Sequence, residues 1–254
     1  MRIGVPKEVK PQENRIGLTP KSVKVLTSNG HKILIQNNGG FEAGFYNNQY
    51  IKAGATIVDK AEDIFNDSEI IVKVKEPLSN EIKMIKENQI IFTYLHLAAD
   101  KKLTEGLVKS KSVCIAYETV TDNNGRLPLL APMSAIAGQL SVVVGSYHLL
   151  KPNHGRGTLL SNLDPRIVTV IGGGVAGNAA IAKAISNDAT VNVIDSSNIK
   201  LKSLQEIYGD SGINYILSTP DSITEAISQS DLVIGSVYVV GKEAPKVITK
   251  EMLK

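Results

Sequence analysis

Three glycines in the second half of the chain have the spacing of a phosphate-binding turn. Gly172, Gly174 and Gly177 fit the pattern G-x-G-x-x-G, after the β-favouring run 168–171 and before an alanine-rich segment. In such a turn the first glycine permits the tight bend, the second lets a pyrophosphate approach the backbone, and the third lets a helix lie close to the strand. Free N–H groups at the start of that helix then face the phosphates. The pattern therefore predicts a dinucleotide-binding site.

An acidic residue stands where such a site needs one. A second β-favouring run, 190–194, ends at Asp195, about 20 residues past the glycines, where a carboxylate can bind the hydroxyls of the adenosine ribose. A negative charge at this position favours NAD, because it would repel the 2′-phosphate of NADP. The alternative is a β-α-β unit with an ordinary glycine turn and a solvated aspartate. The order of strand, turn, helix, strand and acid favours the dinucleotide site.

Four polar residues in the first half have the chemistry to act on an amino or keto acid. A guanidinium such as that of Arg15 can hold a carboxylate at two points, Lys75 can polarise a keto oxygen, and His96 can carry a proton near neutral pH. Lys75 and Glu118 follow predicted strands and His96 lies just beyond one, at the strand ends where α/β folds bind ligands. Each residue also has an ordinary interpretation. Arg15 can be a solvated loop residue and Lys75 a surface lysine. His96 can be a core histidine and Glu118 a surface cap.

These residues need a scaffold of alternating strands and helices. The first half predicts strands at 2–5, 32–36, 70–74, 90–93 and 112–116, with helices at 21–29 and 103–109. The second half predicts a long apolar helix at 133–150, strands at 168–171, 190–194, 214–217 and 231–237, and helices at 199–208 and 223–229.

The predicted fold class is α/β, with two doubly wound domains. Residues 1–127 form a substrate domain and residues 128–254 a Rossmann NAD-binding domain that is incomplete, since only about four of its strands are present. The strand at 232–237 is then expected to expose an apolar edge and face. Residues 247–254 look like the start of a helix.

Composition narrows the class of protein. Of 254 residues, 43% are hydrophobic and 21% charged, as in ordinary globular proteins. The net charge is +3 with scattered lysines, which predicts no nucleic-acid partner. Cys114, the only cysteine, lies in an apolar run and is expected in the core, so no disulfide framework, zinc cluster or other metal site is expected. Neither a signal segment nor a bilayer-spanning run is recognisable, so a cytoplasmic location without a membrane partner is expected.

Several segments together resemble the alanine dehydrogenase and nicotinamide nucleotide transhydrogenase family, over essentially the whole chain. The Thr-Tyr-Leu-His and Val-Lys-Glu-Pro segments are similar to the dehydrogenase rather than to the transhydrogenase. The segments that carry the resemblance are MRIGVPKE at 1–8, NRIGLTP at 14–20, VKVKEP at 72–77, FTYLHLA at 92–98, AYETV at 116–120, PLLAPMS at 128–134 and DLVIG at 231–235.

The resemblance implies a reversible, NAD-dependent oxidative deamination of L-alanine to pyruvate and ammonium. It implies that Arg15 holds the substrate carboxylate, that Lys75 contacts the keto oxygen and that His96 is the proton-handling catalytic residue. It also implies a homohexamer, with the long helix beginning near Met133 contributing to subunit contacts. Around NAD it implies the motif glycines Gly172, Gly174 and Gly177 together with Ser134, Val175, Ala176, Asp195, Lys200, Ser218, Val237 and Tyr238.

The chain also departs from the family pattern. Members continue well past Lys254, with a strand ending in a catalytic aspartate, so the resemblance implies a C-terminally truncated chain with little or no activity alone. Ala43 stands where a serine is usual and His154 where a glycine is common. Two alternatives stay open: an NAD-binding or assembly fragment without turnover, and a subunit like the transhydrogenase alpha subunit.

Overall fold

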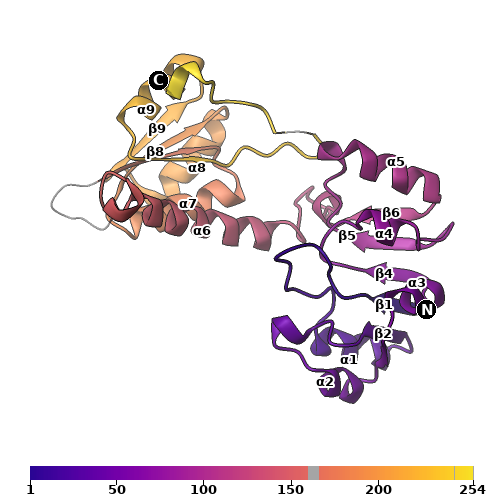
Figure 1. Cartoon of the computed structure of the whole chain (residues 1–254). Coiled ribbons are helices and arrows are strands. Elements are labelled where there is room, and N and C mark those ends of the chain that lie inside the picture. Colours follow the sequence, from indigo (N-terminus) through magenta and orange to yellow (C-terminus); the bar gives the residue numbers. More distant parts are fainter. Residues whose placement is uncertain (160–165, 243, 254) are drawn as a thin grey trace. The chain divides into compact units, whose positions relative to one another are not determined.

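The computed structural model describes residues 1–159, 166–242 and 244–253. The chain folds into two compact units, Met1–Leu127 and Pro128–Lys254, coloured indigo to magenta and pink to yellow in Figure 1. Each unit contains one sheet in which every strand pairing is parallel, with helices between the strands. The predicted α/β class with two domains is therefore confirmed.

The first unit has a six-stranded sheet in the order β3-β2-β1-β4-β5-β6. Because the order reverses between β1 and β4, the carboxyl ends of these two strands flank a topological switch point, where open α/β sheets bind ligands. The strands are β1 (Arg2–Val5), β2 (Lys32–Gln36), β3 (Thr56–Val58), β4 (Ile70–Val72), β5 (Ile90–Thr93) and β6 (Val113–Ala116). The helices are α1 (Pro20–Ser28), α2 (Asn47–Lys52), α3 (Ala61–Asp67), α4 (Ser79–Ile82) and α5 (Lys101–Ser110), with 3-10 turns η1 (Phe41–Ala43), η2 (Leu97–Ala99) and η3 (Tyr117–Thr119).

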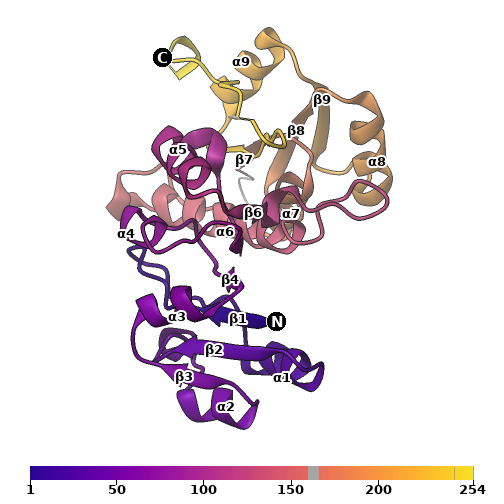
Figure 2. The ribbon, with the colours of Figure 1, turned by 90° about the vertical axis from the view of Figure 1, so that its right-hand side faces the viewer.

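Local sequence explains how this unit forms. Thr19 caps α1 by accepting a hydrogen bond from the Ser22 amide at 3.2 Å, and Pro20 occupies the first turn, where a missing N–H costs nothing. The central strands are short β-branched runs that helices cover, so Val5, Ile71 and Ile91 are fully buried. Figure 2 shows β1 and β2 beside each other, with the first helices around them.

The second unit has a four-stranded sheet in the order β10-β7-β8-β9, and four strands were predicted. Its strands are β7 (Ile167–Ile171), β8 (Thr190–Asp195), β9 (Ile213–Leu217) and β10 (Leu232–Gly235). Its helices are α6 (Ala131–Leu149), α7 (Val175–Ile185), α8 (Asn198–Tyr208) and α9 (Pro220–Gln229), with 3-10 turns η4 (Lys151–Asn153) and η5 (Glu251–Leu253). None of the helices within the described residues is long and apolar enough to cross a membrane.

Several predicted boundaries were wrong. β4 ends at Val72 rather than at residue 74. The Lys73 amide still bonds to the Phe92 carbonyl of β5, but the Val74 and Lys75 amides bond to the Glu8 side chain instead of to a neighbouring strand. The expected helix at 247–254 is only the 3-10 turn η5, and Lys254 lies outside the described residues. The prediction omitted β3, α2, α3 and α4, each of which has seven residues or fewer and is too short to show a clear periodicity.

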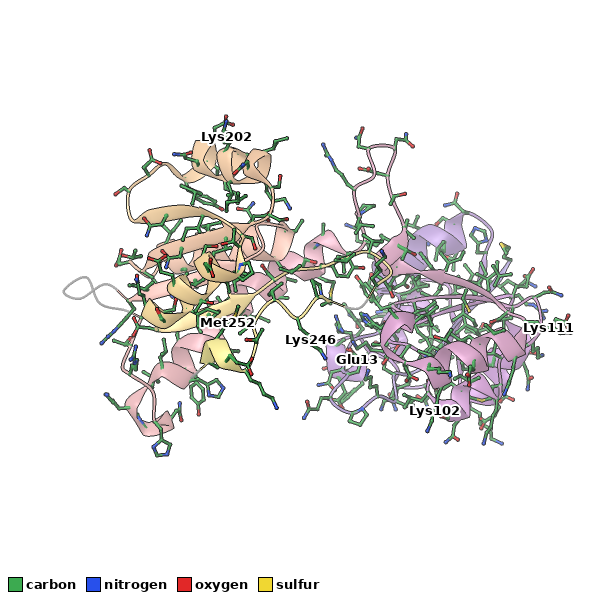
Figure 3. The ribbon with its side chains drawn as sticks, turned by 90° about the horizontal axis from the view of Figure 1, so that it is seen from above. Glu13, Lys102, Lys111, Lys202, Lys246 and Met252 are labelled. Atoms are coloured by element: carbon green, nitrogen blue, oxygen red, sulfur yellow. The ribbon has the colours of Figure 1, made fainter. Side chains whose placement is uncertain are left out.

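β10 lies at the edge of its sheet, as predicted. Its apolar face is partly covered by the end of the chain, because Val233 packs in one cluster with Val247, Ile248 and Met252. Figure 3 labels Met252 on the second unit. It also labels Lys102 on α5, Lys111 directly after the same helix, and Lys202 on α8.

Candidate active site and dinucleotide site

The candidate substrate residues all follow strands of the first sheet. Arg15 lies in the loop after β1, Lys75 after β4, His96 after β5 and Glu118 after β6. Because all strands of this sheet are parallel, their carboxyl ends meet at one edge. Four positions far apart in the sequence therefore share one edge, and β1 and β4 flank the switch point.

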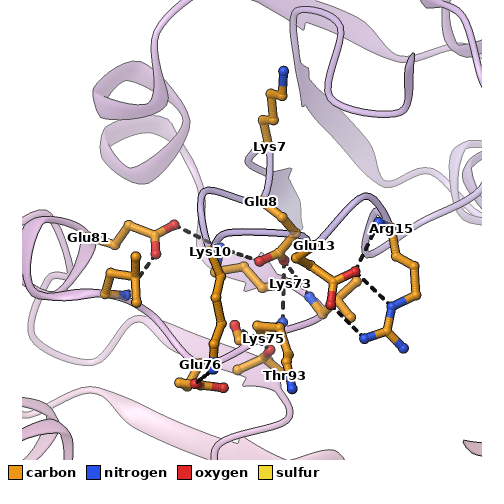
Figure 4. Close-up of polar contacts among 12 residues, drawn as sticks. Lys7, Glu8, Lys10, Glu13, Arg15, Lys73, Lys75, Glu76, Glu81 and Thr93 are labelled. Atoms are coloured by element: carbon orange, nitrogen blue, oxygen red, sulfur yellow. Dashed lines mark hydrogen bonds and ion pairs between the residues drawn. The ribbon is translucent and has the colours of Figure 1, made fainter. Parts of the chain in front are cut away.

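Arg15 is held by a carboxylate from its own loop (Figure 4). Its Nε donates to Glu13 Oε1 at 2.8 Å and its Nη2 to Glu13 Oε2 at 2.6 Å, a two-point ion pair of the kind that orients a guanidinium. The hydrogen bond from Arg15, together with the charge of Lys75, lowers the pKa of Glu13 below its ordinary value. Arg15 and Lys75 thus both act on one carboxylate and lie in the same part of the site.

The backbone of Lys75 is fixed from two sides. Glu8 Oε1 accepts hydrogen bonds from the Val74 amide at 2.6 Å and from the Lys75 amide at 3.4 Å. The Thr93 hydroxyl donates to the Lys75 carbonyl at 2.9 Å. These bonds come from the loop after β1 and from β5, so they place the lysine at the switch point.

A buried lysine lies behind this segment. Lys73 is 1% exposed, and its Nζ contacts Glu8 at 3.1 Å and Glu81 at 2.7 Å. Glu81 also accepts a hydrogen bond from the Leu78 amide at 2.9 Å. Burial raises the pKa of Glu8 above its ordinary value, in spite of the Lys73 cation and the Val74 hydrogen bond. The single Lys73 cation is shared by the two carboxylates, and this cluster holds both ends of the segment that carries Lys75.

His96 has an unusual backbone and an aromatic neighbour. Its φ is 51°, in the left-handed region that non-glycine residues seldom adopt. The Tyr94 ring stacks on the imidazole, with centroids 6.2 Å apart and planes at 13°. Burial raises the pKa of Tyr94, and the nearby Arg15 cation opposes that rise. Tyr94 therefore stacks on His96, and its pKa also responds to the charge of Arg15.

Glu118 is buried rather than a surface cap. Its carboxylate accepts hydrogen bonds from the Leu95 amide at 3.1 and 3.3 Å and from the His96 amide at 2.7 Å. The ordinary interpretation of Glu118 was therefore wrong. Sequence reasoning gave no role to Glu8, Glu13 or Tyr94. A lysine between two valines, as at position 73, is also typical of a strand with one exposed face, so no local signal indicates that Lys73 is buried with Glu8 and Glu81.

The glycine turn of the second unit fits a pyrophosphate. Gly172 has φ +100°, which favours glycine, and its amide donates to the Ile194 carbonyl at 2.7 Å. A Cβ on Gly177 would lie 1.8 Å from the Gly172 carbonyl oxygen, so only glycine lets α7 approach the turn this closely. A Cβ on Gly174 would meet nothing within 4 Å, so the backbone at the start of α7 is open to a ligand.

Asp195 ends β8 beside this turn. Its carboxylate accepts from the Gly173 amide at 2.7 Å and from the Ser197 amide at 2.9 Å, and Lys200 Nζ lies 3.4 Å away. Burial raises the pKa of Asp195, but the two amide bonds and the lysine more than offset this, so the pKa lies below its ordinary value. The group is therefore ionised at neutral pH.

The other predicted cofactor residues lie near the same sheet edge. Val175 and Ala176 form the first turn of α7, Ser218 follows β9, and Val237 and Tyr238 follow β10. Ser134 lies on α6 one turn before Gly138, where a Cβ would be 2.0 Å from the Ala176 carbonyl oxygen, so α6 passes directly beside the start of α7. Among the described residues, no group of three or more histidines, cysteines or acids could hold a metal ion.

The fold and these two sites define a class of protein: a dinucleotide-dependent oxidoreductase whose second unit is the NAD-binding domain. The chain belongs to the alanine dehydrogenase/PNT family, since the model of the N-terminal domain matches residues 4–137 and that of the C-terminal domain matches residues 141–254. The predicted family is confirmed.

Individual relatives agree with this assignment. The chain is 44% identical to an alanine dehydrogenase from Halomonas elongata over 256 residues, and 40% identical to one from Methanococcus maripaludis over 257 residues. It is covered completely in both comparisons and spans 69% of each relative's length.

Solved structures give the same picture. An L-alanine dehydrogenase structure matches the whole chain with a TM-score of 0.89 and 42% identity, over 70% of its own length. A transhydrogenase structure from Sinorhizobium meliloti matches with a TM-score of 0.81 at 23% identity, which shows a shared fold alone.

Proposed function

We propose that this protein catalyses the reversible, NAD-dependent oxidative deamination of L-alanine to pyruvate and ammonium. The observation that supports this most strongly is the placement of Arg15, Lys75 and His96 after strands whose carboxyl ends share one edge of the first sheet. Glu13 binds Arg15 there, and Tyr94 stacks on His96. The full-length similarity to alanine dehydrogenases gives independent support. The transhydrogenase likeness is confined to the fold and favours no second activity.

Each residue has a role that its chemistry allows. The Arg15 guanidinium binds the substrate carboxylate, since a planar fork matches two oxygens. The Lys75 ammonium stabilises the oxygen that gains negative charge as ammonia attacks the keto group of pyruvate or, in the opposite direction, as the carbinolamine expels ammonia. His96 moves the proton between water and the substrate, because an imidazole can do so near neutral pH.

The cofactor residues belong to the same proposal. Asp195 binds the adenosine ribose hydroxyls, and the open backbone from Gly172 to Gly177 binds the pyrophosphate. Around them we place Ser134, Val175, Ala176, Lys200, Ser218, Val237 and Tyr238. When bound, NAD supplies the hydride acceptor, and the protein supplies orientation and charge.

A homo-oligomer in the cytoplasm completes the proposal. The long helix α6 exposes Ile136, Leu140, Val143, Val144 and Tyr147, an apolar stripe that monomeric proteins rarely leave uncovered. A homohexamer that buries this stripe between copies is the form we propose. Light scattering on the purified chain and on an Ile136→Glu/Val143→Glu variant tests it, since the variant should be smaller than the parent.

Activity assays test the central proposal. In this chain extended to the length of its relatives, of which it spans 69%, L-alanine should drive NADH formation measured at 340 nm, and pyruvate with ammonium should drive the reverse. Arg15→Lys, which keeps the charge but loses the fork, should raise KM for pyruvate by about 10- to 100-fold. His96→Asn should lower kcat by about 100-fold or more. Lys101→Met, at a side chain that is 88% exposed on α5, is the matched control and should change neither constant.

The assays also separate the alternatives. NADH binding without alanine-dependent turnover would favour an NAD-binding or assembly chain. Hydride exchange between two nicotinamide cofactors without alanine would favour transhydrogenation. An Arg15→Lys variant with the parent's KM would overturn the assigned role of the arginine.

A further inference from the structure

The Glu118 carboxylate bonds to the backbone of the loop that carries His96. It lies on η3, after β6, whereas His96 lies after β5, and the two strands pair with Thr93 opposite Ala116. The buried Glu118 carboxylate reaches across these strand ends and accepts hydrogen bonds from the consecutive amides of Leu95 and His96. Successive backbone N–H groups that converge in this way form an anion-binding nest, and here the anion comes from the chain itself.

We propose that Glu118 is a positioning residue for the proposed proton-handling residue His96, and the inference rests on that proposed function. His96 adopts φ 51°, a conformation that a histidine does not prefer without support. The 2.7 Å bond from its amide to Glu118 provides that support, because a hydrogen bond to a charged acceptor is stronger than a neutral one. The backbone conformation in turn sets the direction in which the imidazole leaves the chain.

The surroundings of Glu118 strengthen the inference. The Leu95 side chain is 1% exposed, so one residue of the loop is anchored by packing while Glu118 fixes the next. Tyr117, adjacent to Glu118 on η3, packs edge-on against Tyr94 at 5.0 Å, and Tyr94 stacks on His96. The single turn η3 therefore controls both the backbone and the aromatic neighbour of the histidine.

Two titratable side chains near the loop, Tyr94 and Arg15, have other interactions, and Glu118 accepts the hydrogen bonds from the amides of Leu95 and His96. Tyr94 has its pKa raised by burial and, more weakly, by the charge of Glu118, so it stays a neutral phenol near pH 7. Arg15 faces the same tyrosine from the loop after β1 and is bound to Glu13. The described polar contacts of the Glu118 carboxylate are the amides of Leu95 and His96.

Three variants of the full chain test the inference. Glu118→Ala removes the acceptor and should lower kcat for L-alanine oxidation by about 100-fold, with KM for L-alanine changed by less than about threefold. Glu118→Gln keeps an acceptor oxygen and should recover kcat to within about tenfold of the parent. Thr119→Ala, on the same turn at an exposed position, is the control and should leave both constants unchanged.

Amide hydrogen exchange tests the proposal independently of catalytic turnover. By NMR, the Leu95 and His96 amides of Glu118→Ala should exchange with solvent at least about tenfold faster than in the parent, while amides of β5 stay protected. A Glu118→Ala variant with parental kcat, or with unchanged amide exchange at both residues, would overturn the proposal. So would a kcat loss that Glu118→Gln does not recover. If the parent shows no alanine-dependent turnover, the proposed function fails, and the exchange experiment alone decides whether Glu118 holds the loop.

Discussion

Replacing the acid of the dinucleotide site should change which cofactor the protein binds. Asp195 is ionised at neutral pH and contacts Lys200 at 3.4 Å. In Asp195→Asn the side chain keeps its size and an oxygen that can accept the Gly173 amide, but it loses its charge. The substitution therefore isolates the electrostatic contribution of the carboxylate to cofactor choice.

The magnitude follows from the distances. Two like charges about 4 Å apart near a protein surface repel by about 4 kcal/mol, and the Lys200 cation beside Asp195 offsets part of this. A net penalty of about 2–3 kcal/mol on a 2′-phosphate corresponds to a preference of about 30- to 150-fold for NADH over NADPH. Loss of the charge should also weaken NADH binding by about tenfold, since hydrogen bonds from ribose hydroxyls to a charged acceptor become neutral ones.

Cofactor fluorescence measures this without turnover. Titration of the parent and of Asp195→Asn should show NADPH affinity rising and NADH affinity falling, so that the preference nearly disappears. Adding Lys200→Ala to Asp195→Asn should remove the gain in NADPH affinity. In the single variant, the Lys200 cation beside position 195 would attract the 2′-phosphate of NADPH. Lys202→Ala, on the same helix α8, is the control.

Two outcomes would refute the reasoning. Unchanged affinities for both cofactors in Asp195→Asn would mean that the carboxylate does not face the ribose. A parent that loses its NADH preference between pH 9 and 7, where the 2′-phosphate remains largely doubly charged, would also contradict it. The pKa of Asp195 lies below its ordinary value, so the charge should persist throughout that range.

Three further predictions concern packing and charge. Gly177→Ala should abolish NADH binding and lower the melting temperature, because its Cβ would lie 1.8 Å from a carbonyl oxygen. Gly174→Ala, where a Cβ meets nothing within 4 Å, should fold normally and only weaken NADH binding. An equal loss of melting temperature in both variants would be inconsistent with this. Lys73→Met should lower the free energy of unfolding in urea by about 3–5 kcal/mol, since it leaves two buried carboxylates uncompensated, and a change below about 1 kcal/mol would disprove the role of this cluster. The pKa of Glu13 is lower in the folded protein than its ordinary value. It therefore contributes stability that is present above the ordinary carboxyl pKa and is lost as pH falls through the folded pKa, so Glu13→Gln should slightly flatten the acid side of a plot of unfolding free energy against pH. An unaltered acid side would show that the Arg15–Glu13 pair contributes nothing to stability.

The sequence determined the features that depend on neighbours along the chain. The β-favouring runs, the Thr19-Pro20 helix start and the glycine turn with its acid are local signals, and the α/β class with two parallel sheets follows from their alternation. The short elements β3 and α4 were missed because so few residues carry no reliable periodicity. Arg15, Lys75 and His96 were recognisable as candidates only through their types and segments.

Only the tertiary structure decided which of these residues meet and what holds them. Glu8 and Lys73 are 65 positions apart, and no local pattern couples them, yet their ion pair fixes the segment of Lys75. In the sequence Glu118 could be either a residue of the ligand site or a surface cap, and the structure shows that it bonds across two strand ends to the backbone of His96. Such contacts depend on strand order, because parallel strands bring their carboxyl ends together whatever their separation in the chain.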